Sequence, residues 1–393
     1  MPYLHGSDRH FLKFLSFLML IVLIPTLGLL GFLLQRTISP ILFIRVGILP
    51  SQYLGHFLYE VDLYLADEDD YAGIRKIDLI TFQPIVSNKY LEDKIRLALK
   101  IRNPILVYPI YLVNRLLSPN SRYLKRFAKD FKLNDSARLA SLPPNKIARE
   151  IISETHNELT ELYIEKSIKN LFVFFLRTKS FPYLRKGVLD SKSSIYRDVS
   201  SSDYDQLMFS LNVFGKSFVL GHDTPLAKEL NLKIVEVEKI NFGLCSKSKV
   251  SITTDSGSAL IPFFLRKPIV QTNISMFGLI YGIPSKLILP KMYLDLESGI
   301  KLTFRECLRQ GIHNVTNDLE FSKKKIKVLS LDEYTLRDLA QEIIEISNQA
   351  WEPSALNLKV TDEFRSEFLQ LYPLLQFQTF PNFWVEKNLW FFA

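Results

Sequence analysis

The sequence predicts an α/β protein with two domains, each built on an open and mostly parallel sheet, preceded by one transmembrane helix. Three observations lead to this prediction. The length of 393 residues suits two domains. Short apolar, β-branched runs alternate with amphipathic segments of helical period, which is typical of parallel sheets covered by helices. Residues 14–34 form a single uncharged apolar run, FLSFLMLIVLIPTLGLLGFLL.

The apolar run is long enough to cross a membrane, because about twenty helical residues span a ~30 Å hydrocarbon core. A secretory signal has a shorter core and a small-x-small cleavage site, which Leu33-Leu34-Gln35 does not provide. We therefore expect an uncleaved single-pass anchor, with a buried core helix as the alternative. The aromatic-rich segments 109–117 and 380–392 are too short or too broken to span. Each could lie against a membrane surface or pack on a domain, and we expect packing.

Composition limits the classes of function. A hydrophobic content of 47% allows large cores, and a net charge of +8 suits a protein near an anionic membrane or substrate without indicating nucleic acid. The two cysteines, Cys245 and Cys307, belong to no Cys-x-x-Cys or Cys/His cluster, so we expect small buried side chains. The acidic segment 67–70 lacks EF-hand spacing and is expected to be a solvated loop. The sequence predicts neither a metal nor a cofactor.

The order of elements gives the domain boundaries. The first domain has expected strands at 41–46 and 76–82, a loop at 47–55, helices at 56–65 and 89–100, and a further segment at 105–117. Asn145 is expected to cap a long amphipathic helix that runs to about residue 170. We expect an anchor at 1–36, a first domain at 37–145, a linking helix at 146–170, a second domain at 171–350 and a C-terminal extension at 351–393.

The second domain has the same alternation. Its expected strands are 171–177, 217–221, 250–253 and 269–272, with a short extended piece at 232–237, and its expected helices are 203–213, 258–265, 301–311 and 334–348. This pattern predicts a second parallel sheet covered by helices.

The segment Lys249–Asn273 contains the strongest candidate site. A buried strand leads into a polar turn, residues 254–258, and then into a helix. Helix N-termini carry unpaired amides and favour negative charge, so this turn can hold a diphosphate. The alternative is an ordinary βα turn capped by Asp255 or Ser256. Other polar residues follow neighbouring strands, at the sheet edge where ligands bind, and they favour the first interpretation: Arg177, His222 and Asp223.

Several motifs occur in the same order as in a bacterial family of glycosyltransferases that is found with surface-polysaccharide genes and has a GT-B-like fold. The chain resembles this family through IRVGIL at 44–49 and VDLYL at 61–65, Phe175-Leu176-Arg177, Ser194-Ile195-Tyr196-Arg197-Asp198, Gly221-His222-Asp223, Thr254-Asp255-Ser256-Gly257-Ser258 with Pro268 and Thr272-Asn273 after it, and Leu289-Pro290-Lys291. The family has a histidine two residues before the arginine at 177 and an asparagine at 198, where this chain has Phe175 and Asp198.

The resemblance implies two Rossmann-like domains of GT-B type, with a nucleotide-sugar donor on the second and a glycan or lipid-linked acceptor on the first. It implies metal-independent sugar transfer. Together with the anchor expected at 14–34, it leads us to expect a single-pass protein of the bacterial inner membrane with its catalytic part in the cytoplasm. The implied donor-binding residues are Arg177, Arg197, His222, Asp223, Thr254, Asp255, Ser256, Gly257 and Ser258. Candidates for the base that takes the acceptor proton are His56, Glu60 and Asp62, none of which is singled out by spacing.

Two other functions remain open at this point. One is a catalytically inactive GT-B-like scaffold in polysaccharide assembly, which the changes at positions 175 and 198 favour. The other is a nucleotide-sugar epimerase with a GT-B-like fold. A dinucleotide-binding dehydrogenase is not expected, because no Gly-x-Gly-x-x-Gly opens a helix after a strand.

Overall fold

The computed structural model describes residues 22, 24–66, 75–127, 133–154, 169–178, 195–221, 234–281, 283–368 and 379–392. The chain forms two compact units, Met1–Lys129 and Asp130–Ala393. Each unit contains parallel strands together with helices, so the predicted α/β class is confirmed.

The first unit is built on a parallel pair of strands. β1 (Leu42–Leu49) pairs with β2 (Arg75–Phe82) along its whole length, and a bridge between Val46 and Leu124 extends the pair. The helices of this unit are α2 (Leu54–Ala66), α3 (Lys89–Ala98) and α4 (Pro104–Leu117). The predicted loop at 47–55 was wrong in its first residues, because the apolar run continues through Ile48 and Leu49 and keeps its pairing with β2.

A buried ion pair joins the two strands. Arg45 and Asp78 are register partners, and the guanidinium donates through Nε and Nη2 to the two carboxylate oxygens at 2.8 Å each. The Tyr64 hydroxyl donates to the same carboxylate at 2.8 Å. Burial alone would raise the pKa of Asp78, but the hydrogen bond and charge of Arg45 outweigh burial and lower it. This bidentate pair fixes the register of β1 on β2.

Residues 24–37 form a helix in the first unit. Within the described part of the chain, no helix is long and apolar enough to cross a membrane. Much of the expected anchor at 14–34 lies outside the described residues, so the anchor stays a prediction.

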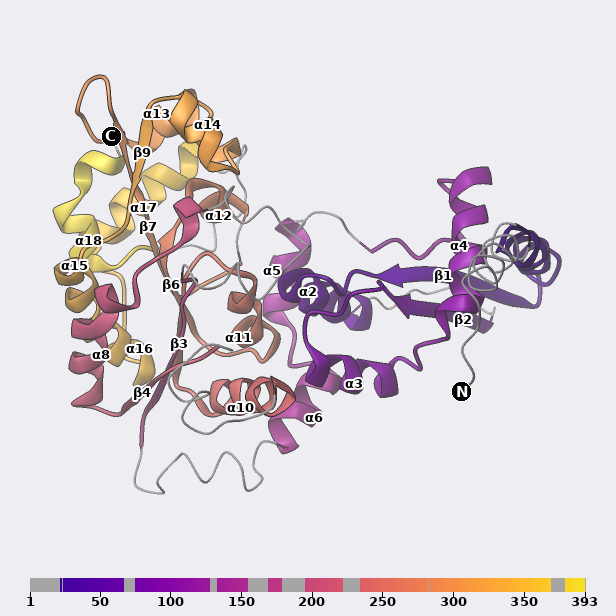
Figure 1. The fold of residues 1–393 in the computed structure, drawn as a ribbon. Coiled ribbons are helices and arrows are strands. Elements are labelled where there is room, and N and C mark those ends of the chain that lie inside the picture. Colours follow the sequence, from indigo (N-terminus) through magenta and orange to yellow (C-terminus); the bar gives the residue numbers. More distant parts are fainter. Residues whose placement is uncertain are drawn as a thin grey trace, which may run out of the picture. The chain divides into compact units, whose positions relative to one another are not determined.

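The second unit contains a five-stranded parallel sheet with the order β4-β3-β5-β6-β7. Its strands are β3 (Leu171–Phe175), β4 (Lys216–Val219), β5 (Val250–Thr253), β6 (Ile269–Ile274) and β7 (Leu287–Pro290). Numbered within the unit, this is the 2-1-3-4-5 order of a doubly wound sheet. Figure 1 shows α10 (Ile234–Lys247) and α11 (Leu260–Phe264) on one face, and α8 (Asp205–Asn212) and α16 (Ala340–Ser347) on the other.

The predicted strands of this sheet are confirmed, but the extended piece at 232–237 was wrong. The β-branched residues at 234, 235 and 237 suggested a strand, whereas they begin α10. Within α10, every residue from Val237 to Ser246 except Lys239 is buried. Burial on nearly all sides of this helix outweighs the local β propensity of its first residues.

Helix ends in the second unit follow capping chemistry. Asn145 accepts hydrogen bonds from the amides of Ile147 and Ala148 at 2.9 Å, so the predicted cap of α6 (Lys146–Glu154) is confirmed. The rest of that expected helix lies outside the described residues. The expected helix at 334–348 is two helices, α15 (Glu333–Asp338), capped by Asp332, and α16. The other described helices of this unit before its C-terminal segment are α5 (Leu133–Ser141), η3 (Ser201–Tyr204), η4 (Gly257–Ala259), α12 (Met276–Tyr281), α13 (Phe304–Arg309), η5 (Ile312–Asn314) and α14 (Asp318–Lys323).

The C-terminal segment belongs to the core of the second unit. It consists of α17 (Ala355–Phe368), α18 (Asn382–Lys387) and η7 (Leu389–Phe392). Phe364, Trp384 and Phe391 are buried in the same cluster as the strands of the sheet, so the predicted packing of 380–392 is confirmed. Beside this cluster, β8 (Met292–Asp295) and β9 (Ile326–Leu329) form an antiparallel pair. Both cysteines are free and buried, as predicted.

Candidate functional site

The candidate site lies at the topological switch point of the five-stranded sheet. The connection from β3 runs outward to β4 on one side, and β5 is its neighbour on the other side. In doubly wound sheets, ligands bind beyond the carboxyl ends of the strands at this point. Arg177 follows β3, and the turn at 254–258 follows β5. His222 and Asp223, expected after β4, lie outside the described residues.

Thr254 joins the two central strand ends. Its hydroxyl accepts a hydrogen bond from the amide of Arg177 at 2.8 Å and donates to the carbonyl of Phe175 at 3.3 Å. Its own amide donates to the same carbonyl at 3.1 Å. Thr254 is fully buried. This side chain therefore holds the backbone before Arg177 in place and does not itself face a ligand.

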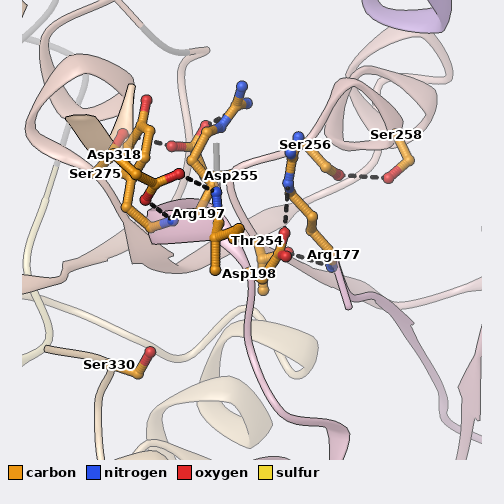
Figure 2. Close-up of polar contacts among 12 residues, drawn as sticks. Arg177, Arg197, Asp198, Thr254, Asp255, Ser256, Ser258, Ser275, Asp318 and Ser330 are labelled. Atoms are coloured by element: carbon orange, nitrogen blue, oxygen red, sulfur yellow. Dashed lines mark hydrogen bonds and ion pairs between the residues drawn. The ribbon is translucent and has the colours of Figure 1, made fainter. Parts of the chain in front are cut away.

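Two ion pairs cross the site, as Figure 2 shows. Arg177 donates through Nε to Asp198 at 2.9 Å. Arg197 donates through Nη2 to Asp255 at 2.8 Å. The two arginines and two aspartates come from three separate segments, after β3, after β5 and the loop at 195–200. Each predicted guanidinium is present, and each is charge-paired in this structure.

The two ion pairs differ in whether burial or mutual attraction determines the pKa values of their members. Burial alone would lower the pKa of Arg197 and raise that of Asp255, but their mutual attraction outweighs burial and moves both pKa values toward the charged forms. In the other pair, burial dominates and lowers the pKa of Arg177 while it raises the pKa of Asp198. In the Arg177–Asp198 pair, the attraction between the two charges therefore does not offset the cost of burying them. Perturbed pKa values of this kind concentrate at functional sites.

Arg197 retains hydrogen-bonding capacity. Its Nε is buried and, among the described residues, has no hydrogen-bond partner. Buried donors are normally satisfied, so an unpaired one needs an acceptor from outside the described part of the chain. The Arg197 side chain is 30% exposed, which leaves a ligand oxygen access to the guanidinium.

Asp255 is a buried carboxylate of the site. Besides the Arg197 pair, its carboxylate accepts a hydrogen bond from the hydroxyl of Ser275, which follows β6. The amide of Gly278 donates to that serine hydroxyl at 3.3 Å. A Cβ at Gly278 would lie 3.3 Å from the Asp255 carboxyl group, so glycine allows this close approach. Asp255 does not act as the side-chain N-cap that one interpretation of the sequence gave it.

The exposed tip of the turn is made by Ser256, Gly257 and Ser258. The two serine hydroxyls lie 2.6 Å apart in a hydrogen bond, as Figure 2 shows. The predicted helix at 258–265 begins as the 3-10 turn η4 and continues as the five-residue helix α11. Ser256 stands at the N-cap position without a side-chain cap bond. These hydroxyls, rather than a long helix dipole, are what the turn offers a ligand.

Lys291 is a site residue that the sequence prediction missed. It follows β7, is 2% exposed, and donates through Nζ to the Asp198 carbonyl at 2.9 Å and to the Ser330 hydroxyl at 3.2 Å. Burial lowers the pKa of Lys291 to about 8, although the charges of Asp255 and Asp198 oppose the shift. The signal in the sequence was its position directly after a buried strand, the same signal that identified Arg177.

The loop that carries Arg197 and Asp198 is held in place by α14. Asp318, in the first turn of α14, accepts hydrogen bonds from the amides of Ile195 and Tyr196 at 2.7 and 2.8 Å. The Tyr196 ring packs against Phe321 of the same helix. This contact positions both charged side chains over the sheet edge, and nothing in the local sequence predicted it.

The three candidate bases lie on α2 of the first unit. His56 is in the first turn of the helix and is partly exposed, whereas Glu60 and Asp62 are buried. His56 and Glu60 are four residues apart and share one side of the helix, while Asp62 projects from another. Since β1 ends at Leu49, His56 lies a few residues beyond the carboxyl end of a parallel strand.

Comparisons with known proteins complete the description. The chain matches no known family model and no curated protein. Among solved structures it is similar to the ADP-heptose LPS heptosyltransferase II of E. coli, at 12% identity over 63% of this chain and 90% of that chain, with a TM-score of 0.34. It is also similar to a glycosyl transferase family 9 structure from Veillonella parvula, at 12% identity over 77% of this chain and 97% of that one, with a TM-score of 0.37. At these TM-scores, neither similarity bears on what the chain does.

Proposed function

We propose that this protein is a glycosyltransferase that moves a sugar from a nucleotide-sugar donor to a glycan or lipid-linked acceptor. The observation that carries the proposal is the location of a basic, polar cluster at the switch point of a doubly wound sheet. The cluster contains two arginines, a buried lysine and a serine-rich turn. The motif resemblance noted in the sequence supports the same assignment.

In this proposal, the diphosphate of the donor binds between Arg197 and the turn at 256–258. The unsatisfied Nε of Arg197 supplies a hydrogen-bond donor, and its guanidinium supplies positive charge. The Ser256 and Ser258 hydroxyls can exchange their mutual bond for bonds to phosphate oxygens. The same groups would stabilise the charge that develops on the leaving nucleoside diphosphate as the bond from the sugar C1 to oxygen breaks.

The acceptor is proposed to bind the first unit, with a base that takes the proton from its attacking hydroxyl. Of the three candidates, His56 combines partial exposure with a location just beyond the carboxyl end of β1. Glu60 and Asp62 are buried, so they fit this role less well. A base of this kind contributes about 10²–10⁴-fold to transfer.

The test is a thermal-shift screen of the full chain against UDP-, GDP-, ADP-, CMP- and dTDP-sugars. A ligand that binds only the native state raises the melting temperature by mass action. We expect a shift with one nucleotide class, its loss in Arg197→Gln, and its retention in Arg305→Gln, which changes an exposed arginine of the same unit. A folded protein that shifts with none of the five would contradict the proposal.

A specific observation favours the inactive scaffold as a second candidate function. Both site arginines are already charge-paired with aspartates, which reduces the positive potential that a diphosphate would meet. The scaffold predicts no thermal shift with any of the five nucleotide sugars and no sugar transfer. Release of nucleoside diphosphate together with transfer of labelled sugar to a lipid-linked acceptor would exclude it, whereas release without any acceptor would indicate the epimerase alternative.

A further inference from the structure

The helix at 24–37 packs closely on α4 within the first unit. A Cβ added at Gly28 would lie 2.6 Å from the carbonyl oxygen of Pro109, and one added at Gly31 would lie 2.4 Å from the Ile110 side chain. Both distances are shorter than atoms tolerate, so glycine is needed at both positions. Close backbone approach at small residues is the packing mode of helices in lipid.

Two polar side chains, Gln35 and Asn114, lie between the helices of this pair. The Asn114 amide donates to the Gln35 side-chain oxygen at 2.7 Å and to the Ile110 carbonyl at 2.9 Å. The Gln35 amide in turn donates to the Ile44 carbonyl at 3.2 Å. Asn114 and Gln35 are both buried. Buried polar side chains that bond one another across two helices are also typical of membrane-embedded pairs.

The large apolar side chains of the pair face outward. On α4, Ile105, Leu112 and Leu116 recur at intervals of seven and four residues, which places them on one stripe of the helix. We call the exposed residues of both helices, which are 42 to 79% exposed, the apolar face: Leu29, Leu30, Leu33, Leu34, Ile105, Leu106, Leu112, Leu116 and Leu117. Monomeric soluble proteins rarely expose large apolar patches, so these exposed side chains on two packed helices indicate a docking surface.

The chain segments that carry the apolar face bear charges of one sign. The sequence has no Asp or Glu from residue 9 to 59 and none from residue 94 to 129. Exposed arginines lie directly before α4, within it and after it, at positions 102, 115, 122 and 126. Basic residues that flank an exposed apolar helix are complementary to the anionic headgroups of a bilayer.

We propose that the apolar face docks on the surface of a bilayer that contains anionic lipids, and that α4 is inserted into its interfacial region. The 14 residues of α4 give a length of about 21 Å, which is shorter than the ~30 Å hydrocarbon core. α4 therefore lies in the interface, with Arg115 and the flanking Arg102, Arg122 and Arg126 among the headgroups. This contact adds α4 to the expected N-terminal anchor, because Leu29 to Leu34 belong to that anchor and the helix at 24–37 that contains them packs on α4.

The test places a reporter on α4 itself, so that it does not depend on how residues before position 24 attach. Burial raises the pKa of the Cys245 and Cys307 thiols to about 12, so neither is reactive at neutral pH. The full chain with Leu116→Cys can then be labelled at one position with an environment-sensitive fluorophore. Leu319→Cys is the matched control, since Leu319 is an exposed leucine of the second unit, at 64% against 79% for Leu116.

Both labelled proteins are mixed with phosphatidylcholine vesicles that contain phosphatidylglycerol and a lipid-attached quencher. We expect a blue shift and loss of fluorescence at position 116 and neither change at position 319. An unquenched label at 116 on vesicle-bound protein would overturn the proposal, as would a full chain that does not bind vesicles. A blue shift at 116 that grows with protein concentration in the absence of vesicles would overturn it in favour of a second copy of the chain.

A second measurement tests the role of charge. The variants Arg102→Gln and Arg115→Gln should each weaken binding to anionic vesicles about fivefold, the effect of one basic residue at a membrane surface. Arg309→Gln in the second unit, which also changes one basic residue of a helix end, should leave binding unchanged. Equal effects from all three variants would contradict docking through this face.

Discussion

The Arg177–Asp198 pair allows a quantitative test of the site. Its side chains are only 9 and 6% exposed, and burial already disfavours both charges. In Arg177→Met, Asp198 loses its counter-charge while it stays buried. Removing one partner of a buried pair costs about 3–5 kcal/mol. The raised pKa of Asp198 lets it take up a proton more easily, so we expect the lower end, about 3 kcal/mol.

The double variant Arg177→Met/Asp198→Leu should recover most of this loss. Replacing a whole buried pair with apolar residues is often neutral or stabilising. We therefore expect an unfolding free energy within about 1 kcal/mol of the natural protein. The double variant should still fail to respond to nucleotide sugars if Arg177 binds the donor, which separates the structural role of this pair from a role in binding.

The assay is urea unfolding followed by tryptophan fluorescence. All three tryptophans, Trp351, Trp384 and Trp390, lie in the second unit, so the signal reports on the unit that carries the site. With a slope of about 3 kcal/mol per molar urea, the single variant should lower the midpoint by about 1 M.

Arg305→Met is the matched control, because its pair with Glu367 is 58 and 44% exposed. Exposed pairs contribute about 0–1 kcal/mol. The reasoning is refuted if Arg177→Met loses no more stability than Arg305→Met, or if the double variant is as unstable as the single one.

Three further predictions concern the same unit. The folded protein releases the Lys291 proton at its pKa of about 8, whereas an unfolded lysine keeps its proton up to about 10.5, so the unfolded state binds more protons in this window. The unfolding free energy of the natural protein should therefore rise with pH relative to that of Lys291→Met, by at most about 1.4 kcal/mol per pH unit. Urea titrations of both proteins across this pH window measure the difference. A difference that stays constant with pH would contradict the lowered pKa of Lys291. Asn145→Ala removes the cap of α6 and should cost about 1 kcal/mol in urea unfolding, with Asn145→Asp close to the natural protein. Gly215→Ala brings a Cβ to 2.3 Å from the Asn170 carbonyl oxygen, and calorimetry should show a lower melting temperature from a loss of about 1–3 kcal/mol; an unchanged melting temperature would show that the turn before β4 adapts.

The sequence by itself determined the elements around the site. The β-branched run at Val250–Thr253 is flanked by a polar turn and a second apolar run, and only a buried strand followed by a short helix fits that pattern. The asparagine at 145 determined a helix start in the same way, because its side chain can satisfy free amides wherever the chain turns into a helix. Such signals are local, so they can be found without knowledge of the rest of the chain.

Tertiary structure alone decided which charges meet. Arg197 and Asp198 are adjacent in sequence, but their side chains pair with different neighbours. Arg177 reaches Asp198 across 21 positions, and Arg197 reaches Asp255 across 58. Lys291 bonds to the same loop across 93 positions. These pairings follow from the strand order, which places the ends of β3, β5 and β7 at one sheet edge.

Tertiary structure also decided the burial of the helix pair in the first unit. In sequence, Gln35 and Asn114 are polar residues within apolar runs, and a soluble helix would turn them toward water. In the structure they are buried against each other while the leucines beside them are exposed. Periodicity shows which residues share a helix face, but only packing against a second helix decides which face is covered.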